Sequence, residues 1–204
     1  MKVLSVYGYT QSGKTTVVEA IIKGLRAKRY SVGSIKEIHF EEFVIDTPGT
    51  NTYRHREAGS QLVSARGMKE TDILYNEMLK LTDILKHYDH EYVICEGVTD
   101  YNLPKILTAK SIEEIEERWE SGIFAISGVI AETISEYKGL PVINVLKEPE
   151  KLISLVEEKV FDLLPDVPIE CCSACGYDCR TFTEKILNGE AKREDCVQVK
   201  SDVK

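Results

Sequence analysis

The chain carries Gly8-Tyr9-Thr10-Gln11-Ser12-Gly13-Lys14-Thr15 between an apolar run, residues 3–7, and a segment of helical spacing that begins at Lys14. This is the pattern of a phosphate-binding loop, in its required place after a strand and before a helix. The two glycines allow backbone angles that a side chain would penalise, so successive N–H groups can point at phosphate oxygens beside the positive end of the helix. Lys14 is expected to reach the terminal phosphates, and the Thr15 hydroxyl to hold Mg²⁺. The loop predicts nucleotide binding by residues 8–15 and the adjoining Thr16.

Composition limits the class of protein. The 204 residues are 43% hydrophobic and 29% charged, as in a soluble globular protein with one α/β domain and a small appendage. A net charge of −8 argues against a nucleic-acid or anionic-membrane partner bound through bulk electrostatics. The first residues run straight into the predicted strand, and no apolar run approaches membrane-spanning length. We therefore expect no membrane association and a cytoplasmic location.

Short apolar runs alternate with segments of helical spacing along most of the chain. Strands are predicted at residues 2–7, 31–39, 61–65, 69–74, 92–97, 105–109, 123–127 and 142–145, and helices at 14–28, 54–58, 77–88, from 111, and at 149–163. This alternation predicts an α/β fold, a three-layer P-loop NTPase sandwich with a mainly parallel sheet.

A break in the pattern divides the chain. Residues 164–168 contain two prolines within four positions and cannot continue a helix, which is typical of a stiff linker. We expect residues 1–163 to form the nucleotide-binding domain. Residues 164–204 would hold the linker and a small cysteine-rich metal-binding module.

Two acids are candidates for the metal of a bound nucleotide. Mg²⁺ on a triphosphate usually gains a carboxylate, either as a ligand or to orient its waters. Glu96 ends a predicted central strand, and Asp46 lies on the polar segment after residues 31–39. A solvated surface acid is the alternative for each. Lys36 and His39 could also face the site, although a lone histidine more often has a structural role.

The base of the nucleotide is weakly marked. The Asn-Lys-x-Asp pattern of GTPases is absent. Strand order should place the loop after residues 123–127 near the base, and this loop carries Ser127-Gly128, with no acid to pair with guanine. On these residues alone ATP and GTP are not separated.

Several motifs together resemble one family of P-loop proteins. They are Gly8–Thr15, Gly33-Ser34-Ile35-Lys36, Ile45-Asp46-Thr47-Pro48-Gly49 with Tyr53-Arg54 and Ala58-Gly59, Cys95-Glu96-Gly97 and Pro104-Lys105-Ile106. Over roughly residues 1–160 the chain resembles the MobB family of molybdopterin-guanine dinucleotide biosynthesis adaptors. The resemblance implies binding of GTP with Mg²⁺ and support for attachment of GMP to molybdopterin. It also implies a homodimer that serves a MobA-like molybdopterin nucleotidyltransferase, and it strengthens Thr15, Asp46 and Glu96 as metal-site residues. Hydrolysis should be slow, at most a weak GTPase activity, because the sequence supplies no obvious arginine finger or water-positioning glutamine.

The sequence departs from that family in two places. Many members have Lys-His-x-His where this chain has Lys36-Glu37-Ile38-His39, so the first imidazole is missing. Members also often have an acid where Gly128 stands, which bears on the preference for guanine.

Five cysteines are crowded between residues 171 and 196. From Cys172 the spacing is C-x2-C-x3-C-x16-C, through Cys175 and Cys179 to Cys196, with a predicted helix at 180–187 before the last. Four soft thiolates suit an iron–sulfur cluster or Zn²⁺. The flanking residues resemble a small 4Fe–4S module attached to corrinoid proteins, although that module more often has four residues between its second and third cysteines. Zn²⁺ and regulatory thiols remain alternatives; Cys171 is predicted to be a spare and Cys95 a buried structural thiol.

Two other functional classes stay open on the sequence. Arg54, Arg56 or Arg66 could close over phosphates in a small-molecule or nucleotide kinase. The covalent fusion of a nucleotide domain to a cysteine module could also make a redox protein in which nucleotide binding gates electron transfer.

Overall fold

The structure is a computed structural model that describes residues 1–165 and 173–201. The chain divides into two compact units, Met1–Glu37 with Asp89–Lys204 as the first and Ile38–Tyr88 as the second. The predicted linker at 164–168 falls largely on residues outside the described ranges, so the boundary near residue 164 stays a prediction.

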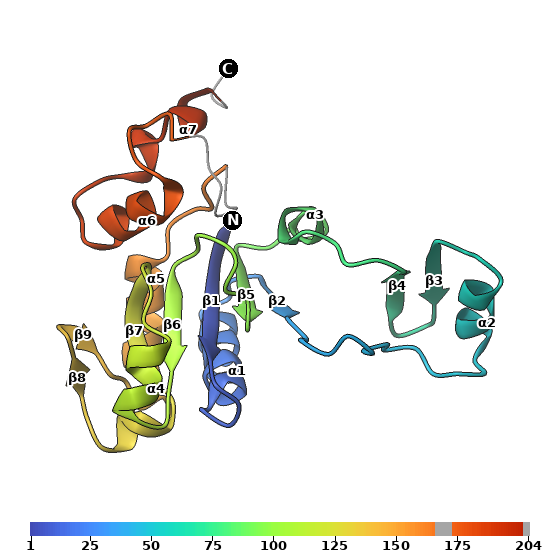
Figure 1. Cartoon of the computed structure of the whole chain (residues 1–204), viewed down its shortest axis with the longest axis horizontal. Helices are drawn as coiled ribbons and strands as arrows, with labels where there is room; N and C mark the ends of the chain where they lie inside the picture. Colours follow the sequence, from blue (N-terminus) through green and yellow to red (C-terminus); the bar gives the residue numbers. More distant parts are fainter. Residues whose placement is uncertain (166–172, 202–204) are drawn as a thin grey trace. The chain divides into compact units, whose positions relative to one another are not determined.

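The first unit is built on one parallel sheet (Figure 1). Its strands are β1 (Lys2–Gly8), β2 (Val32–Lys36), β5 (Tyr92–Glu96), β6 (Lys105–Thr108) and β7 (Ile123–Ser127), in the order β2-β5-β1-β6-β7. Strands β5, β6 and β7 are buried at every residue, as expected when helices cover both faces of a parallel sheet. Because the strands are parallel, their carboxyl ends meet at one edge, and the phosphate-binding loop leaves β1 at that edge.

Strand alternation distributes the core between the two faces of the sheet. Leu4 and Val6 pack on α1 (Lys14–Ala27) and α5 (Pro149–Lys159). Tyr7 belongs to the opposite cluster, with residues of α4 (Ile112–Glu117) and the 3₁₀ helix η1 (Val129–Glu132). The predicted α/β fold with a mainly parallel sheet is confirmed.

The second unit contains α2 (Asn51–Glu57), an antiparallel hairpin of β3 (Leu62–Arg66) and β4 (Thr71–Tyr75), and α3 (Leu81–Leu85). The helix predicted at 77–88 is therefore wrong in length. Its first part carries Met78, which is almost fully exposed, and an apolar helical face with nothing to pack on gains little stability.

Other predicted boundaries also need correction. The strand at 142–145 is wrong: within it only Val142 pairs with the sheet, by a single bridge to Ile126, and the chain then turns where Asn144 Oδ1 accepts the Leu146 N–H. The predicted helix 149–163 ends at Lys159, because Val160 is extended. A small hairpin, β8 (Glu136–Tyr137) with β9 (Leu140–Pro141), was not predicted.

The C-terminal segment of the first unit packs against the edge of the parallel sheet where the strands begin. It forms α6 (Cys179–Leu187), the 3₁₀ helix η2 (Arg193–Asp195) and α7 (Val197–Ser201). Leu187 joins the core cluster of α1 and α5, and Thr183 Oγ1 donates to the Asn102 carbonyl, 3.3 Å away, shortly before β6. This contact edge is opposite to the edge that carries the phosphate-binding loop.

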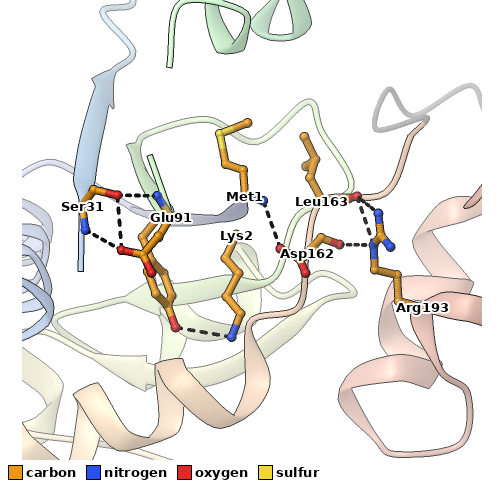
Figure 2. A network of polar contacts seen from close by, with 8 residues as sticks. Met1, Lys2, Ser31, Glu91, Asp162, Leu163 and Arg193 are labelled. Carbon is orange, nitrogen blue, oxygen red and sulfur yellow. Dashed lines mark hydrogen bonds and ion pairs between the residues drawn. The ribbon is translucent and has the colours of Figure 1, made fainter. Parts of the chain in front are cut away.

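Polar contacts reinforce this docking (Figure 2). Arg193 donates to the carbonyl oxygens of Asp162, at 2.9 Å, and Leu163, at 3.2 Å. The Met1 amino group donates in turn to the Asp162 carboxylate at 3.0 Å. The start of β1 and the C-terminal segment thus share one acceptor residue. Among the helices of the two described ranges, none is both long and apolar enough to cross a bilayer.

Replacing Leu187 with alanine tests whether the C-terminal segment is part of the folded unit. Leu187 is 6% exposed and lies in the main core cluster, so the free energy of unfolding should fall by about 2–4 kcal/mol in denaturant titration. The matched control is Val197→Ala, because Val197 is 39% exposed and should change the free energy by less than about 1 kcal/mol. Equal effects of the two changes would show that the segment does not share the core.

Candidate nucleotide-binding site

The phosphate-binding loop is held against the end of β6. Gly8 has φ +148° and Gly13 φ +99°, the glycine conformations that the sequence predicted. A Cβ on Gly8 would lie 2.0 Å from the Thr108 carbonyl oxygen. The Ser12 hydroxyl lies 2.7 Å from the Thr108 hydroxyl, which donates to the Tyr7 carbonyl at 3.1 Å. Thr108, which was not predicted as a site residue, therefore fixes the loop.

The loop also touches the segment after β7 through backbone atoms. Val129 N–H donates to the Ser12 carbonyl at 3.2 Å, and a Cβ on Gly128 would lie 2.1 Å from the same oxygen. A Cβ on Gly13 would lie 3.2 Å from Gly128 Cα. Packing thus requires a glycine at position 128 in this chain.

Three strand ends bring together the predicted metal-site pair Thr15 and Glu96. The Thr15 hydroxyl donates to Glu96 Oε1 at 3.0 Å, and the Lys36 ammonium group donates to the same oxygen at 2.6 Å. Glu96 is only 8% exposed and lies opposite both Val6 and Lys36 in the parallel register. A hydroxyl and a carboxylate oxygen at this distance suit a hard cation such as Mg²⁺.

Cations surround the loop although the chain as a whole is acidic. The Lys14 ammonium group donates to the carbonyls of Gly8, at 3.1 Å, and Tyr9, at 2.7 Å. Burial and the nearby positive charges of Lys36 and Arg118 lower the pKa of Lys14. The negative charge of Glu96 raises it, but by less, so the pKa lies below its usual value. A bound polyphosphate would offset both unfavourable effects on the charged ammonium group.

Sequence reasoning missed Arg118. Its guanidinium lies over the Tyr9 ring, 4.4 Å from the centroid, and the Tyr9 hydroxyl donates to Glu117 at 2.8 Å. The end of α4 therefore supports the tip of the loop. No local motif surrounds Arg118, so only the packing of α4 beside the loop reveals it.

A cavity of about 120 Å³ adjoins the first turn of α1. It is lined by Gly13, Thr16, Val17, Gly128, Val129, Glu132, Asn144, Val145 and Leu146. Strand order predicted that the segment after β7 would lie near a base, but the sequence did not single out residues 129–146.

Comparisons with known proteins agree with this geometry. The family model for "Molybdopterin guanine dinucleotide synthesis protein B" (MobB) matches residues 3–129, more than half of the chain. The chain belongs to the MobB family. A second family model, described as "Putative Fe-S cluster", matches residues 169–198.

Named relatives support the assignment. A Methanocaldococcus jannaschii protein called "Putative molybdopterin-guanine dinucleotide biosynthesis adapter protein" is 30% identical over 207 aligned residues, covering 98% of this chain and 78% of that protein. A Bacillus subtilis protein called "Probable molybdopterin-guanine dinucleotide biosynthesis adapter protein" is 25% identical. That alignment covers 70% of this chain and 84% of the Bacillus subtilis protein. The crystal structure of Bacillus subtilis MobB covers 80% of this chain and all of that one, with a TM-score of 0.67 and 22% identity, and shows the same fold.

Asp46 has a local role in this MobB-family chain. It belongs to the second unit, where its carboxylate accepts from the Thr47 N–H and from the hydroxyls of Thr50 and Thr52. Burial opposes the charged form, but these hydrogen bonds hold the pKa of Asp46 below its usual value. Asp46 thus organises the start of α2, and its role at the metal stays a prediction. His39 and the three arginines proposed for a kinase also belong to the second unit, where Arg56 lies 4.9 Å from the Tyr53 ring centroid.

The predicted cluster ligands are described in part. Cys172 lies outside the described residues, as does Cys171. Cys175 precedes α6, Cys179 starts it, and Cys196 follows η2; the last two are buried, and none is joined in a disulfide. Within residues 1–165 and 173–201, no three Cys, His, Asp or Glu side chains lie close enough to hold a metal. Cys95 is a buried strand residue as predicted, and burial raises its pKa to about 12.

Gly128→Ala tests the backbone contact that holds the loop. The new Cβ would meet the Ser12 carbonyl, so we expect a loss of about 2 kcal/mol or more in the free energy of unfolding and weaker nucleotide binding. Gly139→Ala is the matched control, because Gly139 has φ +78° but nothing within 4 Å, and should cost about 1 kcal/mol without changing affinity. If Gly128→Ala and Gly139→Ala have the same free energy of unfolding and the same nucleotide affinity, the backbone contact at Gly128 does not hold the loop.

Proposed function

We propose that this MobB-family chain binds GTP with Mg²⁺ and acts as an accessory protein in the formation of molybdopterin guanine dinucleotide. The observation that carries the proposal is the 3.0 Å pairing of Thr15 with Glu96 directly beside Lys14 and the loop amides. This arrangement supplies both a phosphate cradle and an oxygen-rich cation site. The family description and the adaptor names of the relatives support the biosynthetic role.

Each part of the site has an assigned role. Gly8 to Thr16 would hold the phosphates, with Lys14 on the terminal ones. Thr15 and Glu96 would hold Mg²⁺, with Asp46 as an additional carboxylate. The Mg²⁺ ion, when bound, would neutralise part of the negative charge on the phosphates. Glu96 now neutralises Lys36, so Mg²⁺ would compete with that ammonium group for the same carboxylate oxygen.

Hydrolysis should be slow, at most a weak GTPase activity. The Glu96 carboxylate is engaged by Thr15 and Lys36, and Arg118 is stacked on Tyr9. Neither group is arranged to activate water or to compensate charge on a transferring phosphoryl group. This favours a role in which the nucleotide state controls a partner.

The second unit is the proposed interaction surface. It exposes several large apolar side chains, including Phe40, Ile45, Met68, Ile73 and Met78. Exposed apolar side chains grouped in one unit mark protein interfaces. We assign this surface to a second copy of the chain, in the homodimer that the family resemblance implies. A MobA-like nucleotidyltransferase and its molybdopterin would be the partners served by the dimer, in the cytoplasm.

The cysteine module would hold a 4Fe–4S cluster through Cys172, Cys175, Cys179 and Cys196, with Zn²⁺ as the alternative. Thiolates suit either metal, and the family model described as "Putative Fe-S cluster" covers these cysteines. The module contacts the edge where the strands begin, whereas the loop follows the last residue of β1. The 7 residues of β1 at about 3.3 Å each separate the two sites by about 20 Å. We therefore propose that the cluster has a structural role and does not transfer electrons directly to the nucleotide site.

Lys14→Ala tests the nucleotide function. Loss of the ammonium group should weaken binding of GTP with Mg²⁺ by at least about 100-fold in calorimetric titration, because charge-assisted contacts to the terminal phosphates are lost. Lys23→Ala is the control: Lys23 lies further along the same helix, is exposed, and pairs with Glu19 on the surface. Unchanged affinity in the Lys14 variant would refute the site.

Cys179→Ser tests the cluster. Anaerobically purified parent protein should contain iron and sulfide near a 4:4 ratio per chain and absorb in the visible range, and the variant should lose most of both. Cys95→Ser should retain them, because Cys95 is buried in β5. Stoichiometric zinc without iron would select the alternative metal, and equal iron in parent and Cys179 variant would contradict the ligand assignment.

A further inference from the structure

The cavity beside α1 lies where the nucleoside of a bound nucleotide would extend. Gly13 is the N-cap of α1, and Thr16 and Val17 belong to its first turn. The backbone of this turn faces the phosphates in P-loop proteins. The same residues that end the phosphate cradle therefore begin the wall of the cavity.

Four apolar side chains contribute to that wall. Val129 is 47% exposed and Leu146 is 75% exposed, whereas Val17 and Val145 are buried. Large aliphatic groups left in water are unfavourable unless something covers them. A flat heterocycle placed in the cavity would contact these side chains and remove them from water.

Two polar side chains line the same cavity and differ in hydrogen-bonding character. Asn144 is 9% exposed, and its Oδ1 accepts the Leu146 N–H at 3.1 Å. That bond fixes the amide and leaves the Nδ2 group as its donor. Glu132, in η1, carries a carboxylate that can only accept.

From these observations we infer that the cavity is the base subsite and that Glu132 selects guanine. The inference rests on the proposed nucleotide function and names its base-reading residues. Guanine presents two N–H donors, at N1 and the 2-amino group, next to the acceptor O6. The Glu132 carboxylate accepts from the two donors, and Asn144 Nδ2 donates to O6 or N7. Adenine presents an acceptor at N1 in place of the donor, which would face the carboxylate unfavourably.

This placement also explains how the chain reads guanine without an acid at position 128. A Cβ on Gly128 would collide with the Ser12 carbonyl, so no side chain can stand there. Four positions further on, Glu132 lies clear of that backbone contact and still lines the cavity. The base-pairing acid is displaced along the chain, and guanine recognition is retained.

The test replaces the Glu132 carboxylate, which only accepts hydrogen bonds, with the amide of glutamine, which has the same size but both donates and accepts. Dissociation constants of GTP, XTP and ATP with Mg²⁺ are measured for the parent, Glu132→Gln and Glu136→Gln. Glu136 is an exposed acid of the neighbouring hairpin that does not line the cavity, so its variant is the matched control.

We expect the parent to prefer GTP over ATP by at least about tenfold, and Glu132→Gln to lower GTP affinity by about tenfold while ATP changes by less than about twofold. XTP carries a carbonyl in place of the 2-amino group, and the new Gln amide can donate to it. The GTP-to-XTP affinity ratio should therefore fall by at least about tenfold in Glu132→Gln. It should stay at the parent value in Glu136→Gln.

The inference is overturned if the GTP-to-XTP affinity ratio of Glu132→Gln equals that of the parent. It is also overturned if Glu132→Gln loses affinity equally for GTP, XTP and ATP. Thermal melting of each variant confirms that the fold is intact. If the parent binds GTP and the Lys14→Ala variant does not, the phosphate site stands even when the base assignment fails. If the parent binds none of the three triphosphates, the proposed function fails and the base assignment with it.

Discussion

The site depends on close backbone contact between three loops that leave no space for side chains. The phosphate-binding loop meets the end of β6 at Gly8 and the segment after β7 at Gly13 and Gly128, where an added Cβ would lie 2.0, 3.2 and 2.1 Å from its nearest neighbour. Such contact fixes the loop amides in place before any ligand arrives. A preformed cradle spends little binding energy on ordering itself. It also fixes the neighbouring cavity, because Gly13 and Gly128 line both.

Cations gather at the loop although the chain as a whole carries a net negative charge. The net charge is −8, yet Lys14, Lys36 and Arg118 lie close enough for the last two to lower the pKa of the first. Glu96, held by Thr15 and Lys36, contacts the start of the helix that follows the loop, and Glu117 accepts from Tyr9 of the loop. The arrangement attracts a polyphosphate while keeping a carboxylate ready for its cation.

The parallel sheet separates two modules with different chemistry. The carboxyl ends of its strands carry the phosphate loop, and the other edge receives the cysteine-bearing segment through Leu187, Thr183 and Arg193. Influence between them must pass through the packed core that α1 and α5 share with Leu187. The cysteines of α6 and η2 therefore lie away from the loop that would hold the phosphates.

The sequence by itself determined the loop, the parallel α/β fold and the family, because these follow from local glycine positions, strand–helix alternation and short motifs. It also identified Thr15 and Glu96 correctly as neighbours: Glu96 ends β5, and Thr15 lies at the start of α1, just after the adjacent parallel strand β1 and its loop. It misjudged residues 142–145 and 77–88, where a single bridge and an unpacked apolar face replaced the expected regular elements. Arg118, Thr108, Glu132 and Asn144 were decided only by the tertiary structure. Thr108 and Arg118 contact the loop from distant parts of the chain, and Glu132 and Asn144 line the cavity beside the first turn of α1. No local pattern records which loops the sheet will bring together.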